Sequence, residues 1–126
     1  MSDALKRPDL TSPEWKKLDS GLEVWDEKVG AGEPVKPGAK VKVHYTGWLI
    51  DDAATIFDSS VQRGESIEFG LNQVIQGWKD GIPGMKPGGV RVLRIPPALA
   101  YGKRGAGGDI GPDATLVFRV ELLSSK

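Results

Sequence analysis

The side chains that could carry out covalent chemistry are few in this chain of 126 residues. Cysteine is absent, so no thiolate can act as a nucleophile or bind a metal. His44 is the one histidine, and no Gly-x-Ser-x-Gly sequence offers it an activated serine, so we interpret it as a surface or hydrogen-bonding residue. Asp51 and Asp52 lie in a polar segment, where water usually solvates carboxylates. These observations predict an activity that uses neither a metal nor a cofactor.

The glycine-rich segment 102–111 has the composition of a phosphate-binding loop but not its pattern. Neither Gly-x-x-x-x-Gly-Lys-Ser/Thr nor Gly-x-Gly-x-x-Gly can be aligned with it. It also does not open a helix after a parallel strand, which phosphate binding would require. We expect a mobile loop beside a binding site instead.

Charge and composition exclude further classes of protein. The chain has 17 Lys and Arg against 17 Asp and Glu, whereas nucleic-acid-binding domains usually carry a basic excess. No stretch approaches the roughly 20 apolar residues that span a bilayer, and the first residues lack the apolar core of a signal peptide. We therefore expect one cytoplasmic, monomeric domain without nucleic-acid or membrane partners.

The remaining candidates are aromatic side chains and one carboxylate. Taken singly, each aromatic residue belongs more often to a core than to a site. The polar ends of Tyr45, Asp58 and Tyr101, however, need partners if they are buried. We place Phe57 and Asp58 on a loop that borders a strand. The set predicts an aromatic cleft with a polar edge, formed by Tyr45, Phe57, Asp58, Phe69, Trp78, Tyr101 and Phe118.

Hydrophobic periodicity predicts the elements that position this cleft. Val74, Ile75 and Trp78 stand at i, i+1 and i+4, which predicts one short helix opening after Asn72. The pattern becomes strand-like after Gly21, and four clear strand patterns follow, at 40–45, 67–71, 90–95 and 116–122. We predict an α+β fold in which an antiparallel sheet of about five strands curls around the helix.

Residues 1–20 differ from the domain that we assign to 21–126. They are polar and show no alternation, so we expect a partly flexible extension. Thr11-Ser12-Pro13-Glu14 has the spacing of a capping box, which predicts a short helix from Ser12 to Leu18. Trp15 would anchor that helix on the domain.

Five short motifs occur in a fixed order within residues 21–123: His-Tyr-Thr-Gly at 44–47, Phe-Asp-Ser-Ser at 57–60, Val-Ile-Gln-Gly-Trp at 74–78, Ala-Tyr-Gly at 100–102 and Ala-Thr-Leu-Val-Phe at 114–118. Together they resemble the FKBP family, the immunophilin-type peptidyl-prolyl isomerases. The resemblance covers nearly the whole domain and implies the fold described above. It implies a peptidyl-prolyl cis-trans isomerase that assists protein folding and acts on proline-containing peptides and unfolded proteins. Macrolides such as FK506 or rapamycin would bind in the same cleft.

The resemblance also implies roles for single residues. Trp78 would form the floor of the proline pocket, and Asp58 its polar edge, bonded to Tyr45. The backbone N–H of Ile75 and the hydroxyl of Tyr101 would each bind a substrate carbonyl. The N–H role of Ile75 has a physical basis as well, because N–H groups in a first helical turn lack partners within the helix. These five residues are the catalytic set, and further pocket walls would come from Phe57, Phe69, Val74, Ile110 and Phe118.

The chain departs from the family pattern in three places. Ile67 stands where the family often has an aromatic residue, and Ala106 where several members have histidine. The segment 48–56 is about two residues longer than the common form. These changes concern the rim and an edge strand, so we expect them to affect sequence preference and macrolide affinity more than activity.

Rotation about a prolyl peptide bond suits a chain without a nucleophile, because no bond to carbon has to break. The barrier of about 18–20 kcal/mol reflects lost C–N double-bond character. A dry pocket disfavours the charge-separated planar amide, and binding of a half-rotated substrate favours the transition state. Asp58 would act electrostatically and not as a base. Two alternatives are a non-catalytic module that binds a proline segment or a macrolide, and a folding helper with an apolar surface.

Overall fold

The computed structural model describes residues 8, 10–50, 52–100, 102 and 114–125, with the side chains of 52–55 left out. The helices in these ranges are α1 (Ser60–Arg63) and α2 (Gln76–Gly81), with the 3-10 helices η1 (Leu71–Gln73) and η2 (Pro97–Leu99). The strands are β1 (Lys16–Lys17), β2 (Glu23–Lys28), β3 (Lys40–Leu49), β4 (Asp52–Ser59), β5 (Ile67–Gly70), β6 (Val90–Ile95) and β7 (Leu116–Ser125).

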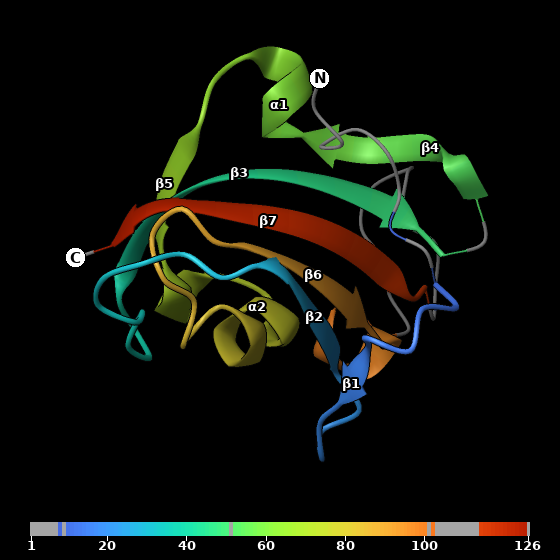
Figure 1. Ribbon diagram of the computed structural model, residues 1–126. Helices are drawn as coiled ribbons and strands as arrows, with labels where there is room; N and C mark the ends of the chain where they lie inside the picture. The colour runs from blue at the N-terminus through green and yellow to red at the C-terminus, as the bar shows by residue number, and fades with distance from the viewer. Residues whose placement is uncertain (1–7, 9, 51, 101, 103–113, 126) are drawn as a thin grey trace.

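The strands form one antiparallel sheet in the order β1-β2-β6-β7-β3-β4. β5 pairs with residues 40–43 of β3. Figure 1 shows β3, β7 and β6 arching over α2, which lies against one face of the sheet. The predicted α+β fold, a curled antiparallel sheet around a short helix, is confirmed. The sheet has seven strands where about five were predicted.

The strands that the sequence did not predict are β1 and β4. β1 has only two residues, too few to show a period. β4 pairs with β3 through two register shifts, between Gly47 and Trp48 and between Trp48 and Leu49. Bulges of this kind insert extra residues into one strand, so the alternation of side chains along β4 is lost. Both register shifts lie along the segment 48–56, which we predicted to be longer than the common family form.

The core lies between α2 and the concave face of the sheet. Along β3 the buried residues Val41, Val43 and Tyr45 alternate with more exposed neighbours, as its period of two predicted. The backbone of α2 touches β6 directly, because a Cβ on Gly77 would lie 2.6 Å from the side chain of Ile95. A six-residue helix is not stable alone in water, so this packing maintains it.

The start of α2 differs from the prediction. The helix begins at Gln76 with Ile75 as its N-cap, while Asn72 lies in η1. η1 buries Leu71 in the core, and the chain extends again at Val74 before α2 begins. Of the three residues whose spacing predicted the helix, only Trp78 lies in α2, because Val74 and Ile75 precede its first residue.

The helix expected from Ser12 to Leu18 is wrong. The Ser12 hydroxyl accepts a hydrogen bond from the backbone N–H of Glu14 (3.2 Å), and the chain then pairs with β2 as β1. Such local side-chain bonds compete with helix formation, and so short a helix has little stability of its own. Trp15 does contact the domain: its ring meets that of Trp25 at 5.8 Å, and the guanidinium of Arg94 lies 4.5 Å above it.

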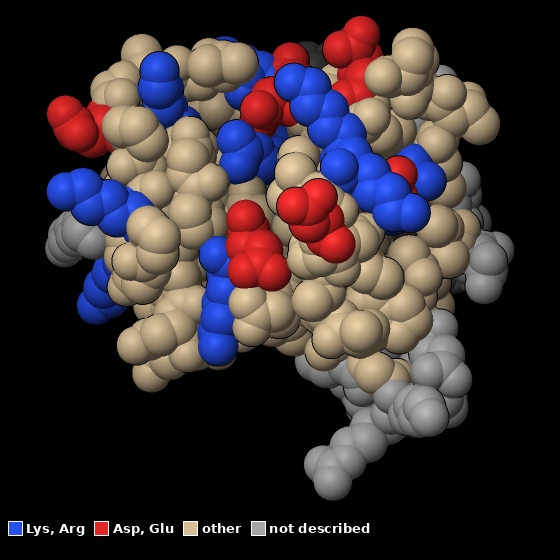
Figure 2. All heavy atoms as spheres, turned by 90° about the horizontal axis from the view of Figure 1, so that it is seen from below, with Lys and Arg blue, Asp and Glu red and all other residues tan. Residues whose placement is uncertain are grey.

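The surface on the α2 side mixes charges of both signs. Figure 2 shows both basic and acidic side chains among uncharged residues on this face. In the part of the chain that the structure describes, no helix is long and apolar enough to cross a membrane.

Candidate functional site

The main candidate site is a cavity of about 450 Å³ between α2 and strands β3, β4, β5 and β7. It brings together every predicted lining residue that the structure describes. Tyr101 and Ile110 of the predicted set, and Ala106 of the predicted rim, lie outside the described residues. The lining consists of Tyr45, Phe57, Asp58, Ile67, Phe69, Gln73, Val74, Ile75, Trp78 and Phe118.

Trp78 stands at the centre of the aromatic side chains. Its ring meets those of Tyr45 and Phe118 edge-on, with centroids 5.3 Å and 5.2 Å apart. Phe69 lies 5.2 Å away in a tilted arrangement, and Phe57 meets Phe118 at 5.4 Å. These are the separations that aromatic pairs favour, so each ring restrains its neighbours. The result is a rigid apolar enclosure with Trp78 buried at its base.

Tyr45, Asp58 and Arg63 form the polar edge of the cavity. The Tyr45 hydroxyl donates a short hydrogen bond to Asp58 Oδ2. Arg63 donates to Asp58 Oδ1 at 2.5 Å and to the Tyr45 hydroxyl at 3.3 Å. The predicted bond between Asp58 and Tyr45 is therefore present in the structure, and Arg63 joins it.

This edge changes the proton affinity of its members. Burial raises the pKa of the Tyr45 phenol above its ordinary value, and donation to Asp58 raises it further. For Asp58, burial alone would raise the pKa, but the hydrogen bonds from Tyr45 and Arg63 lower it below the ordinary value. At neutral pH the edge therefore carries a charged carboxylate beside a neutral phenol.

The backbone N–H of Ile75 has no hydrogen-bond partner among the described residues. Ile75 is the N-cap of α2, and its carbonyl accepts bonds from the N–H groups of Trp78 (3.0 Å) and Lys79 (3.2 Å). Its own N–H precedes the first helical bond and belongs to a residue that lines the cavity. The site therefore holds a free main-chain donor beside Trp78.

Two predicted site residues lie in a different element from the one expected, and two further residues join the site. Phe57 and Asp58 lie in β4 and not on a loop, with Asp58 opposite Gly47. The absence of a side chain at Gly47 is required, because a Cβ there would lie 2.7 Å from the Phe57 ring and 2.8 Å from the Phe118 ring. Arg63 was missed, since its contact depends on the turn of α1 five residues after Asp58. Gln73 was missed too, and no periodic signal in the sequence marks it.

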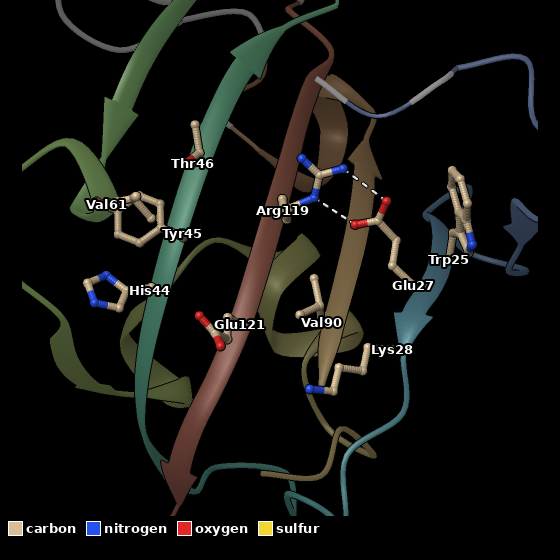
Figure 3. A pocket seen from close by; sticks show the side chains of 10 residues that line it. All are labelled: Trp25, Glu27, Lys28, His44, Tyr45, Thr46, Val61, Val90, Arg119 and Glu121. Carbon is tan, nitrogen blue, oxygen red and sulfur yellow. Dashed lines mark hydrogen bonds and ion pairs between the residues drawn. The ribbon is translucent and has the colours of Figure 1, made fainter. Parts of the chain in front are cut away.

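A second cavity, of about 480 Å³, lies on the opposite face of the sheet. Figure 3 shows its side chains spread over β2, β6, β7 and β3, with Val61 of α1 at one end. Arg119 and Glu27 form a two-bond ion pair across it, at 2.6 and 2.9 Å. His44 pairs with Ser60 at its edge (Nδ1 to Oγ, 2.9 Å), in agreement with the hydrogen-bonding role expected for this histidine. Because these polar groups already bind each other, the aromatic cavity is the stronger candidate.

Comparison with known proteins connects this geometry to one family. Residues 31–123 match the family model described as FKBP-type peptidyl-prolyl cis-trans isomerase. The chain is 50% identical over 105 residues to the FK506-binding protein of Neisseria meningitidis serogroup B, which covers 82% of this chain and 94% of that protein. It is 40% identical over 125 residues to the peptidyl-prolyl cis-trans isomerase Mip of Coxiella burnetii, which covers 99% of this chain and 54% of Mip.

A solved structure shares the fold as well. The crystal structure of FkpA from Escherichia coli is similar with a TM-score of 0.85 and 44% sequence identity, over 92% of this chain and 53% of that chain. The chain thus spans about half the length of Mip and of FkpA, but nearly all of the Neisseria protein.

Proposed function

The chain belongs to the family of FKBP-type peptidyl-prolyl cis-trans isomerases and is an isomerase of that type, and we propose that it rotates Xaa-Pro bonds in the aromatic cavity beneath the sheet. The observation that supports this site most is the aromatic enclosure around Trp78, which stands beside the charged edge of Tyr45 and Asp58. The proline ring would rest on Trp78, and the residue before proline would extend past the edge.

The enclosure would act on the substrate by replacing its water. A planar amide is more charge-separated than a twisted one, so an apolar pocket disfavours the planar ground state. Gripping the prolyl ring and the preceding carbonyl in a half-rotated arrangement adds binding that exists only in the transition state. About 7 kcal/mol of such preference corresponds to roughly a 10⁵-fold rate.

Hydrogen-bond donors would supply part of this preference. The free N–H of Ile75 would bind one substrate carbonyl, and the hydroxyl of Tyr101 a second. One well-placed donor is worth about 3 kcal/mol in other enzymes. The remaining walls, Val74 and Ile110 among them, would exclude water. The Asp58 carboxylate would act through its charge, because its low pKa makes it a poor base at neutral pH.

The first test is the cis-to-trans relaxation of Leu-Pro and Phe-Pro peptides, with and without excess rapamycin-type macrolide. Catalysis that the macrolide abolishes, and that Trp78→Ala reduces, would support turnover in this cavity. Catalysis that persists in both cases would refute the assigned site. Macrolide binding without catalysis would favour the alternative, a recognition module for a proline-containing segment.

Further parts of the proposal concern partners and location. We propose that unfolded proteins with exposed proline are the substrates, and that macrolides such as FK506 compete for the same cavity. The similarity to a protein named FK506-binding protein supports macrolide binding. We propose a cytoplasmic location, which the absence of cysteine fits, and a monomeric state. A folding-helper activity independent of the cavity would survive Trp78→Ala, which makes that alternative testable in a refolding assay.

A further inference from the structure

The pairing of β3 is interrupted at one place along its β4 edge. Residues 40–43 of β3 pair with β5, and residues 46–49 pair with β4. His44 and Tyr45 lie between these two ladders. Opposite them the chain leaves β4 after Ser59 and turns into α1 at Ser60. On this edge, therefore, none of the described strands pairs with the main chain of Tyr45.

The hydroxyl of Ser60 fills this gap. It accepts a hydrogen bond from the Tyr45 N–H at 2.7 Å and lies 3.3 Å from the Tyr45 carbonyl oxygen. His44 Nδ1 lies 2.9 Å from the same hydroxyl oxygen and donates or accepts according to the tautomer of the ring. One side chain thus replaces the donor and the acceptor that a paired residue would offer. Ser60 is fully buried, so water cannot take over these bonds if the hydroxyl is removed.

The same short segment carries the partners of the Tyr45 side chain. Asp58 precedes Ser60 by two residues and Arg63 follows it by three, and both bind the Tyr45 hydroxyl. The distance between this segment and Tyr45 is therefore fixed from both ends of the tyrosine, by Ser60 at its backbone and by Asp58 at its phenol. Figure 3 shows Tyr45 beside His44 and Val61 at this junction of β3 and α1.

We propose that Ser60 is a positioning residue, whose hydroxyl holds the backbone of Tyr45 so that the phenol meets Asp58 at the edge of the aromatic cavity. The expected effect on catalysis rests on the proposed function, whereas the positioning of Tyr45 does not. It gives the second serine of the Phe-Asp-Ser-Ser motif a role distinct from that of the first.

Ser59 provides a matched control. It is a neighbouring serine, also buried, and its hydroxyl makes bonds of comparable length. These bonds go to the Gln62 N–H of α1 (3.1 Å) and to the Thr46 hydroxyl (3.0 Å), not to Tyr45. Ser59→Ala should therefore weaken the same junction without releasing Tyr45. A merely structural role for Ser60 would make the two alanine variants behave alike.

The phenol itself reports the position of Tyr45. The chain has two tyrosines, so in a Tyr101→Phe background Tyr45 is the only one, and its ionisation can be followed by ultraviolet absorbance. Because donation to Asp58 contributes to the raised pKa of Tyr45, Ser60→Ala should lower that pKa toward the ordinary value of about 10. Ser59→Ala should leave it raised.

Turnover is measured in the full chain with Tyr101 intact, at a temperature where circular dichroism shows each variant folded. We expect Ser60→Ala to reduce kcat/KM about tenfold, through kcat, and Ser59→Ala to change it less than about twofold. Ser60→Thr keeps the hydroxyl and should restore both the raised Tyr45 pKa and kcat/KM. If Ser60→Ala does not fold, Ser60→Thr serves as the test, because a fall in its phenol pKa would contradict the inference.

The outcomes separate the two proposals. A phenol pKa that does not differ between Ser60→Ala and Ser59→Ala would overturn the positioning role. A phenol pKa that falls while kcat/KM is unchanged would support the positioning role and refute the part that we assign to the Tyr45–Asp58 edge in catalysis. A fall in both readouts, confined to Ser60→Ala, supports both.

Discussion

Replacing Asp58 by asparagine tests whether this carboxylate acts through its charge or as a base. Asp58→Asn keeps the size of the side chain and one acceptor oxygen, and removes the negative charge beside Tyr45 and Arg63. The Asp58 side chain is 41% exposed, so solvent screens its field substantially. With a separation of about 6 Å from a bound amide and an effective dielectric constant of about 50, Coulomb's law gives about 1 kcal/mol.

That energy corresponds to about a fivefold loss of kcat/KM, whereas losing a general base costs about 10²–10⁴-fold. The assay is cis-to-trans relaxation of a Leu-Pro peptide between pH 5 and pH 9. We expect a loss of about fivefold that does not vary over this range, because the Asp58 pKa lies below it. A loss above 100-fold, or a rate that titrates with a carboxylate, would refute the electrostatic role. Asp80→Asn is the control, since Asp80 is an α2 carboxylate bonded to Gln76 and outside the cavity lining.

The same variant makes a prediction about stability. A carboxyl whose pKa is lowered on folding stabilises the protein above its unfolded pKa, and that contribution is lost as pH falls through the folded pKa. Above pH 5 the free energy of unfolding of the wild type should therefore exceed that of Asp58→Asn by a constant margin of about 1 kcal/mol, a value already reduced for solvent exposure. The margin should shrink as the pH falls below about 4. Urea denaturation at pH 7 and at pH 3 measures both values.

Two further changes test the packing. Gly47→Ala should lower the free energy of unfolding by about 1–3 kcal/mol and raise KM. The new methyl group would displace the Phe57 and Phe118 rings, which it would meet at 2.7 and 2.8 Å. Unchanged values of both quantities, from urea denaturation and from kinetics, would contradict this. Trp15→Ala should lower unfolding free energy by about 1–2 kcal/mol through its lost contacts with Trp25 and Arg94, yet leave kcat/KM unchanged, so a kinetic defect in the folded variant would show that the extension reaches the site.

Sequence reasoning predicted the parts of the fold where one physical signal dominates. The first half of β3 alternates between exposed and buried residues, so Val41 and Val43 could be assigned to the interior from period alone. In β7 all of residues 116–120 are buried, so the period there does not separate Phe118 from its neighbours. The prediction of a short helix at Trp78 is confirmed, although Val74 and Ile75, whose spacing suggested it, precede α2. β4 could not be predicted, since its bulges remove the alternation that would mark it.

The candidate site likewise contains residues that the sequence predicted and residues that it did not. Its aromatic members carry a signal in residue type and spacing, and the structure brings those that it describes around one cavity. Arg63 carries none, because an arginine in a polar segment is usually solvated, and only the turn of α1 directs it to Asp58. The role of Ser60 depends on a gap between two ladders of β3, which exists only once β4 and β5 have paired. Tyr101 and Ile110 remain predictions.

The register of β4 makes the position of Asp58 largely independent of the length of the segment 48–56. Thr46 lies opposite Ser59 and Gly47 opposite Asp58 in regular pairing. The first register shift leaves only Phe57 unpaired, and the second leaves residues 53–55 unpaired between the Trp48–Ile56 and Leu49–Asp52 pairs. We therefore expect insertions or deletions in residues 52–55 to leave Asp58 in place. For engineering, we expect the same place to accept a fluorophore or an affinity tag without displacing Asp58 from the aromatic cavity.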